Sequence, residues 1–261
     1  MDLNGVPATL DQMKALALTN YGHFTSMLVE NGEVRGLSLH MARLSRDCLQ
    51  LFDQDLDTEQ VRGYVRKALG EHAGGRVVVR VTVFDPALDL GTIGHDSNPH
   101  VLVTHRSAGS GSPAPWRLQA AAYQRDMPSV KHVGLWGTMQ RRRAAQRDGY
   151  DDVLFLNPDG TISEVATSNI GFVRDGHVIW PRSAYLAGIT MTLLHQELDE
   201  QIVTEPLTLS DLPSMDAAFA TNAATGVRAV SSIDSTEWSS ETHPVLKELR
   251  ELYADIPAEP V

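Results

Sequence analysis

The sequence of 261 residues contains little cysteine and no long apolar run. Cys48 is the single cysteine, which excludes an intramolecular disulfide and a cysteine-based metal cluster. No segment approaches the roughly 18 consecutive apolar residues of a membrane span, and MDLNGVPATLDQM lacks the basic and apolar regions of a secretory signal. We therefore expect a cytoplasmic protein without membrane partners or a metal site, with Cys48 as a small buried side chain.

Basic residues are also in deficit. The chain has 22 lysines and arginines against 33 acidic residues, a net charge of −11. A negative surface repels polyanions at long range, which argues against nucleic acid as a partner. Small anionic substrates can still bind at local arginines. With 42% hydrophobic residues, the chain can bury a sizeable core.

Lysine is the scarcest of the basic residues, with four copies against 18 arginines. Lys131 differs from the others because Val130 and Val133 flank it in the apolar stretch SVKHVGLWG, residues 129–137. Partial desolvation there would favour the neutral, nucleophilic amine that Schiff-base chemistry requires. A lysine that is ion-paired or extends to solvent is the alternative. The other three lysines occupy polar positions of predicted helices and are Lys14, Lys67 and Lys247.

The first hundred residues alternate between strand and helix patterns. Asn31-Gly32 predicts a tight turn between two strands. Apolar residues at helical spacing predict helices over 40–52 and 57–73, and the β-branched run 76–84 predicts a central strand. A further strand is expected at 100–105. The stretch RSAGSGSPAP that follows has no apolar face and predicts a linker.

The second half repeats this alternation and predicts a second α/β domain. Asp175-Gly176 predicts another hairpin turn. We therefore expect a mixed α/β (α+β) fold with a small N-terminal domain at 1–104, a linker at 105–116 and a larger C-terminal domain at 117–261 that carries Lys131. Helices are expected over 138–149, 191–201 and 244–256, and strands over 151–157 and 161–165. Residues 169–180 are expected to form the two strands of that hairpin, and residues 216–234 a strand, a small-residue turn and another strand.

Glu164 and two small-residue turns are further candidates for chemistry. Glu164 lies among small and apolar residues, where a carboxylate needs a cationic partner. It could face a pyridinium nitrogen, or it could be a strand-end glutamate paired with an arginine. Gly188-Ile189-Thr190 opens a predicted helix, where backbone N–H groups could bind phosphate. The other candidates are the polar residues Ser168, Asn169 and Asn222, together with Ala223 in the same small-residue turn as Asn222.

The order of these motifs resembles the class IV aminotransferase family of fold-type IV pyridoxal phosphate enzymes. That family includes branched-chain and D-amino acid aminotransferases and 4-amino-4-deoxychorismate lyase. The resemblance extends from about residue 18 to residue 235. It rests on FTSMLVENGEVRGLSLHMARL, SVKH, DGYDDVLFLNPDGTISEVATSNIGFVRDGHVIWP, AGIT and FATNAATGVRAV.

The resemblance implies roles for these residues. Lys131 would form the Schiff base with pyridoxal phosphate, Arg43 would contact its phosphate, and Glu164 would face its pyridine nitrogen. The implied fold is the two-domain D-amino acid aminotransferase-like fold with the cofactor between the domains, in a homodimer. The remaining cofactor-binding positions would be Ser168, Asn169, Gly188, Ile189, Thr190, Asn222 and Ala223.

The resemblance leaves the substrate open. Trp136 stands where branched-chain aminotransferases commonly have a tyrosine, and Gly134 stands where lyase-like members have an asparagine. We expect Phe24, Thr25 and Trp136 to contact the substrate. An aminotransferase that uses an amino donor and a keto-acid acceptor is favoured because the asparagine is missing. The alternatives are a lyase that releases pyruvate and a non-catalytic binding protein of the same fold.

Overall fold

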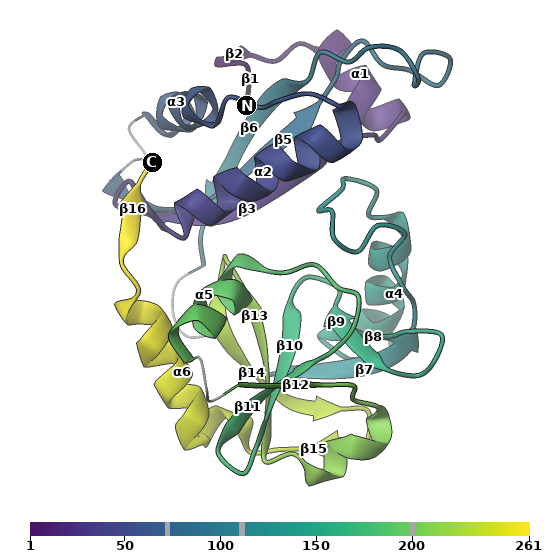
Figure 1. Cartoon of the computed structure of the whole chain (residues 1–261), viewed down its shortest axis with the longest axis vertical. Coiled ribbons are helices and arrows are strands. Elements are labelled where there is room, and N and C mark those ends of the chain that lie inside the picture. The colour runs from purple at the N-terminus through teal and green to yellow at the C-terminus, as the bar shows by residue number, and fades with distance from the viewer. Residues whose placement is uncertain (71–73, 110–112, 199–201) are drawn as a thin grey trace. The chain divides into compact units, whose positions relative to one another are not determined.

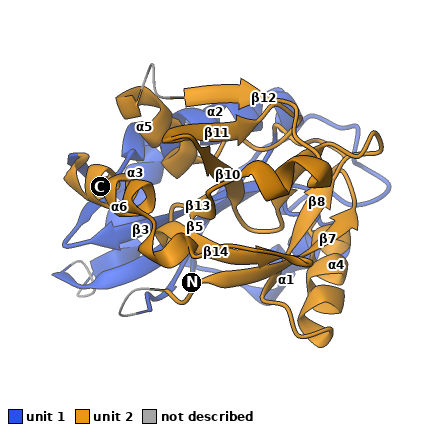
Figure 2. Cartoon of the chain, turned by 90° about the horizontal axis from the view of Figure 1, so that it is seen from below, with its two compact units in different colours: residues 1–110, 130–134, 257–261 blue, residues 111–129, 135–256 orange. Residues whose placement is uncertain are grey.

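The computed structural model describes residues 1–70, 74–109, 113–198 and 202–261 (Figure 1). The chain forms two compact units, coloured separately in Figure 2. Unit 1 comprises residues 1–110, 130–134 and 257–261, and unit 2 comprises residues 111–129 and 135–256. Both contain a sheet with helices packed on it, so the mixed α/β class predicted from the sequence is confirmed.

Unit 1 is built on an antiparallel sheet that has seven strands within the described residues. β3 (His23–Glu30) pairs along its length with β5 (Arg76–Phe84), which pairs in turn with β6 (His100–Ser107). The turn predicted at Asn31-Gly32 joins β3 to β4 (Glu33–Arg35), and both turn residues have positive φ. The outer strands are β1 (Asp2–Leu3), β2 (Val6–Pro7) and β16 (Ala258–Pro260).

Three helices cover this sheet. The valines at alternate positions of β5 pack with α2 (Leu37–Phe52) and α3 (Thr58–Leu69) in one core, which also buries Cys48 as expected. Asp57 caps α3 by accepting a hydrogen bond from the N–H of Gln60. Phe84 belongs to a smaller cluster with α1 (Leu10–Leu18), the helix expected around Lys14.

Two segments from distant parts of the sequence complete unit 1. Residues 131–133 lie antiparallel to the start of β3, with a bridge between His23 and His132. The last residues form β16, which pairs with β4. The predicted boundaries placed both segments in the C-terminal domain. They group with unit 1 because backbone hydrogen bonds join them to its sheet, a long-range pairing that local sequence patterns do not encode.

Unit 2 contains a mixed sheet of nine strands within the described residues. β10 (Asn169–Arg174) and β13 (Ala217–Asn222) are antiparallel neighbours, with Asn169 opposite Thr221. Parallel pairs join β7 to β8, β7 to β14 and β11 to β12. The other strands are β7 (Trp116–Ala122), β8 (Asp152–Leu156), β9 (Ile162–Val165), β11 (His177–Pro181), β12 (Ile202–Glu205), β14 (Gly226–Ile233) and β15 (Thr236–Glu237).

The helices of unit 2 bury apolar side chains against this sheet. Trp180 and Phe219 stack edge to face beneath α5 (Ile189–Leu198) and α6 (Pro244–Asp255). Phe155 packs with Ala145 of α4 (Trp136–Arg147) in a separate cluster. Short 3-10 helices span Leu209–Ser214 and Ser240–Thr242.

Several predicted helices and strands begin or end at other residues in the structure. The linker expected at 105–116 is shorter, because β6 continues through Ser107 and β7 begins at Trp116. Residues 110–112 of that linker lie outside the described residues, as do 71–73 and 199–201 at the ends of two predicted helices. The hairpin predicted at Asp175-Gly176 is confirmed, with positive φ at both residues.

Candidate active site

The backbone around Lys131 is held by two elements of unit 1. The N–H of Phe24 donates to the carbonyl of Lys131 at 2.9 Å, and the N–H of Val133 donates to the carbonyl of Gly22 at 2.9 Å. The Lys131 N–H donates to Oδ2 of Asp47, on α2, at 3.1 Å. Lys131 is partly buried, whereas the three other lysines are exposed. This half-buried, anchored position agrees with the desolvation expected from its valine neighbours.

The Lys131 amine and an arginine guanidinium both lie near the ring of Phe24. Nζ of Lys131 lies 5.0 Å from the centroid of the Phe24 ring, and Cζ of Arg80 lies 3.6 Å from the same centroid. The negative face of an aromatic ring attracts such cations. Nε of Arg80 also donates to the Thr82 hydroxyl at 3.2 Å, and burial lowers the pKa of Arg80. Sequence reasoning missed Arg80, although a charge that interrupts the valine run of β5 was a usable signal.

Arg43 forms a buried polar network with two neighbours. Its Nη2 donates to Oγ1 of Thr25 at 2.6 Å, and the same hydroxyl lies 2.6 Å from Nδ1 of His40. Burial is the main cause that lowers the pKa of Arg43 to about 10, so the guanidinium stays charged at neutral pH. Nε of Arg43 is buried without a hydrogen-bond partner among the described residues. A buried cation with an unused donor is suited to bind an anion such as phosphate.

Glu164, on β9 in unit 2, is paired with an arginine. Nε of Arg125 lies 2.8 Å from Oε1 of Glu164, and the side chains are 9% and 10% exposed, respectively. Arg125 also donates to the carbonyl of Pro128. The second oxygen, Oε2, accepts the Leu186 N–H at 3.4 Å. The arginine partner was the alternative left open by the sequence, and the structure identifies it as Arg125.

The polar candidates of unit 2 form two groups of hydrogen bonds at neighbouring ends of β10 and β13. Nδ2 of Asn222 donates to the Ser168 hydroxyl at 2.9 Å. Asn169 accepts the Gly188 N–H at 3.1 Å and donates to the Leu186 carbonyl at 2.8 Å. The hydroxyl of Thr221, on β13 opposite Asn169, is buried without a partner among the described residues. An unsatisfied buried hydroxyl of this kind marks a place where a ligand oxygen could bind.

Gly188 and α5 present a helix N-terminus next to these hydrogen bonds. The carbonyl of Gly188 accepts the N–H of Thr192, so the helical hydrogen bonds begin there. The amides of Ile189 and Thr190 thus belong to the first turn, where unpaired N–H groups favour anions. The hydroxyl of Thr190 donates to that of Tyr253 at 3.4 Å. The backbone of this turn is therefore better placed for a phosphate than the threonine side chain.

Gly188→Ala is expected to weaken folding. A Cβ at this position would lie 2.1 Å from Oδ1 of Asn169, so the turn must shift and the Asn169 hydrogen bond must break. We expect a loss of about 1–3 kcal/mol in the free energy of unfolding, measured by urea denaturation. Gly94→Ala is the control, because nothing lies within 4 Å of its Cβ. Equal stability of both variants would contradict the expected close contact.

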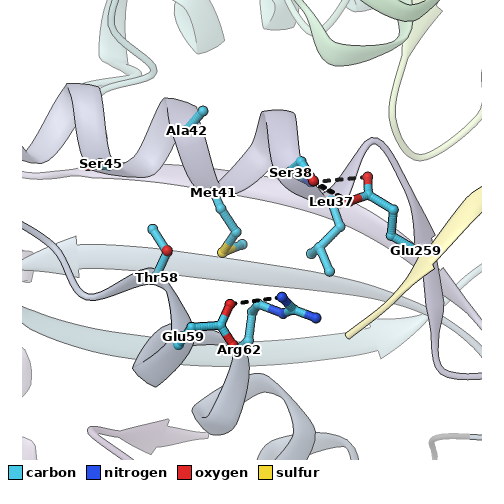
Figure 3. A pocket seen from close by; sticks show the side chains of 9 residues that line it. All are labelled: Leu37, Ser38, Met41, Ala42, Ser45, Thr58, Glu59, Arg62 and Glu259. Atoms are coloured by element: carbon cyan, nitrogen blue, oxygen red, sulfur yellow. Dashed lines mark hydrogen bonds and ion pairs between the residues drawn. The ribbon is translucent and has the colours of Figure 1, made fainter.

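Unit 1 also contains a pocket. It has a volume of about 410 Å³ and lies between α2 and α3 (Figure 3). Glu259 accepts hydrogen bonds from the N–H and hydroxyl of Ser38 at one end. None of the predicted site residues lines it, so we do not assign the chemistry to this pocket. It is lined by Leu37, Ser38, Met41, Ala42, Ser45, Thr58, Glu59, Arg62 and Glu259.

The predicted site residues fall into two sets, one in each unit. Unit 1 brings Lys131 and Arg43 together with Phe24 and Thr25 at β3 and α2. Trp136, expected at the substrate, is the first residue of α4 and is 79% exposed. Ala223 follows Asn222 in the turn between β13 and β14. The set in unit 2 comprises Trp136, Glu164, Ser168, Asn169, Gly188, Ile189, Thr190, Asn222 and Ala223.

Comparison with known proteins identifies the family. The model of the family described as amino-transferase class IV matches residues 22–233. The chain belongs to this family. Family membership and the relatives below indicate an enzyme, a pyridoxal-phosphate-dependent aminotransferase. Among the described residues, no helix has the length and apolar character needed to cross a membrane.

Relatives of this class IV aminotransferase are described as branched-chain enzymes. A "Probable branched-chain-amino-acid aminotransferase" of Rickettsia bellii is 24% identical over 97% of this chain and 94% of its own length. An Aquifex aeolicus protein with the same description is 34% identical, but the match covers 42% of this chain and only 37% of that relative. The higher identity therefore concerns only part of the relative.

Solved structures confirm the fold. A Legionella pneumophila protein, provisionally described as a 4-amino-4-deoxychorismate lyase, superposes with a TM-score of 0.84 at 21% identity, over 97% of this chain and 96% of its own. A branched-chain amino acid aminotransferase from T.th., solved with pyridoxamine 5'-phosphate, gives 0.83 at 21% identity, over 95% and 88%. Because both activities occur at equal similarity, this likeness shows the fold and leaves the substrate open.

Proposed function

We propose that this enzyme transfers an amino group between an amino acid or amine and a 2-keto acid, with pyridoxal phosphate attached to Lys131. The observation that carries the proposal is the setting of Lys131. It is the lysine whose backbone is anchored to both β3 and α2, and its amine lies over the Phe24 ring. The T.th. relative, solved with pyridoxamine 5'-phosphate, supports the choice of cofactor.

The cofactor fits the donors that unit 1 offers. When bound, pyridoxal phosphate withdraws electrons from the carbon that carries the substrate amine. The Lys131 amine would act as the general base that takes the proton from that carbon and as the general acid that delivers it to carbon C4′ of the cofactor, so that the substrate carbon is left ready to become a keto group. Arg43 would bind the phosphate, since its buried guanidinium is charged and its Nε has no other partner among the described residues.

Unit 2 offers the complementary groups. The Glu164 carboxylate would accept a hydrogen bond from the protonated pyridine nitrogen, while Arg125 reduces the cost of burying its charge. The N-terminal amides of α5 and the unpaired Thr221 hydroxyl would bind phosphate oxygens. Ser168, Asn169 and Asn222 would hold these elements in place through the hydrogen bonds between them.

Product analysis with purified enzyme distinguishes a transferase from a lyase. We expect conversion of a branched-chain amino acid only when a keto-acid acceptor is present, because the lyase-type asparagine is replaced by Gly134. The measurement is chromatography of products with and without 2-oxoglutarate. Release of pyruvate from 4-amino-4-deoxychorismate without an acceptor would instead support the lyase, to which the Legionella structure corresponds in fold. Absence of both reactions would favour the non-catalytic alternative.

We further propose a cytoplasmic homodimer. Support comes from the family likeness and from the sequence, which has a single buried cysteine and so no intramolecular disulfide. The small-molecule partners would be the amino donor and the keto-acid acceptor. Phe24, Thr25 and the exposed Trp136 remain the proposed substrate contacts.

A further inference from the structure

Asp47 carries a carboxylate that is fully buried next to Lys131. The residue is 0% exposed on α2. Its Oδ1 accepts two hydrogen bonds from Arg46, from Nε at 3.0 Å and from Nη2 at 2.7 Å. Its Oδ2 accepts the backbone N–H of Lys131 at 3.1 Å. Oδ1 therefore accepts from a neighbour on α2 itself, and Oδ2 accepts from the segment that contains Lys131.

The surroundings of Asp47 explain how a buried carboxylate is tolerated there. A buried charge is costly unless it is paired and hydrogen-bonded, and Arg46 supplies the pairing charge. Asp47 also counteracts the lowering of the Arg43 pKa by burial. His23 is buried as well, and burial lowers its pKa to about 4 although Asp47 opposes the shift. At neutral pH His23 is thus uncharged, and the cations that interact with Asp47 are Arg46 and Arg43.

The position of Asp47 on α2 connects two functional residues. Arg43 lies four residues earlier, which places it on the same face of the helix, one turn away. Arg43 is fixed to β3 through Thr25, and Asp47 reaches the Lys131 peptide from the next turn. We propose that Asp47 is a positioning residue, which sets the Lys131 backbone at a fixed distance from Arg43. This inference rests on the proposed role of Lys131 as the cofactor-bearing residue.

Amide exchange in the cofactor-free protein tests the contact directly. The Lys131 N–H should exchange slowly because its acceptor is a buried, charged carboxylate. In Asp47→Ala we expect its exchange to accelerate about 10- to 100-fold, measured by NMR or by fragment-resolved mass spectrometry. Asp47→Asn keeps an oxygen acceptor at the same place, so we expect it to restore part of the protection. An unchanged exchange rate in Asp47→Ala would overturn the proposal.

A matched variant separates positioning from general destabilisation. Cys48→Ala removes a fully buried side chain from the next position of α2 and leaves the Asp47 hydrogen bond intact. We expect Cys48→Ala to lower the melting temperature while Lys131 exchange, relative to other core amides, stays at the wild-type value. If Cys48→Ala accelerates Lys131 exchange as much as Asp47→Ala does, the role of Asp47 is only structural and the proposal fails.

Reductive labelling connects the contact to the chemistry. Wild-type and variant proteins are incubated with pyridoxal phosphate, reduced with borohydride at timed intervals and digested for peptide mapping. We expect labelling of Lys131 to be about 10-fold slower in Asp47→Ala and intermediate in Asp47→Asn. Equal labelling rates in wild type and Asp47→Ala would refute positioning. Absence of label on Lys131 in wild type would refute the proposed function instead, and the exchange measurement would still report on the Asp47 contact.

Discussion

Lys131→Ala is expected to abolish aminotransferase activity and to eliminate the pyridoxal phosphate adduct that borohydride fixes. The proposed cofactor linkage and the proton transfer at the substrate carbon both need this amine. Loss of general acid-base catalysis alone lowers rates about 10²–10⁴-fold, and loss of the linkage adds to that. Steady-state kinetics and mass mapping of the reduced protein measure the two effects.

The other three lysines provide the matched controls for Lys131. Lys14 and Lys247 form exposed ion pairs within their helices, and Lys67 is exposed on α3. Alanine at any of them should change the free energy of unfolding by less than about 0.5 kcal/mol and leave the label on Lys131. A label on one of these lysines in the wild-type protein would contradict the assignment. Retained activity in Lys131→Ala would do the same.

The local features of this chain could be predicted from its sequence. Asn31-Gly32 and Asp175-Gly176 adopt the positive φ values that tight hairpins require, and few other residue pairs do so without strain. The helix expected at 57–73 and the valine-rich strand β5 could also be predicted from local patterns. Motif order also gave the family, because the matching segments extend over most of the chain.

The contacts that arrange the candidate site could not be predicted in this way. Asp47 is 84 residues from Lys131, and Arg125 is 39 residues from Glu164. No local period or turn signal connects such pairs. With 18 arginines in the chain, the sequence could indicate that Glu164 needs a cationic partner but not which arginine it is. The pairing of β16 with β4 was missed for the same reason.

The Arg125–Glu164 pair should show strong coupling in stability. Removing either partner leaves a charge that is about nine-tenths buried, and breaking such a pair costs about 3–5 kcal/mol. We therefore expect Arg125→Met and Glu164→Leu each to destabilise the protein by about that amount, measured by urea denaturation. The double variant replaces both charges with apolar groups, and we expect it to recover most of the lost stability.

Activity separates the two roles that Glu164 would have. If Glu164 only neutralises Arg125, the double variant should regain activity along with stability. If Glu164 also faces the pyridine nitrogen, as we propose, the double variant should fold and remain at least about 100-fold less active, because a preorganised charge at the reacting group is missing. Glu164→Gln keeps an oxygen that can accept from Arg125, so it should be less destabilised than Glu164→Leu and equally slow. Wild-type kcat in the double variant would show that this carboxylate serves the fold alone, and the residue opposite the pyridine nitrogen would have to be another.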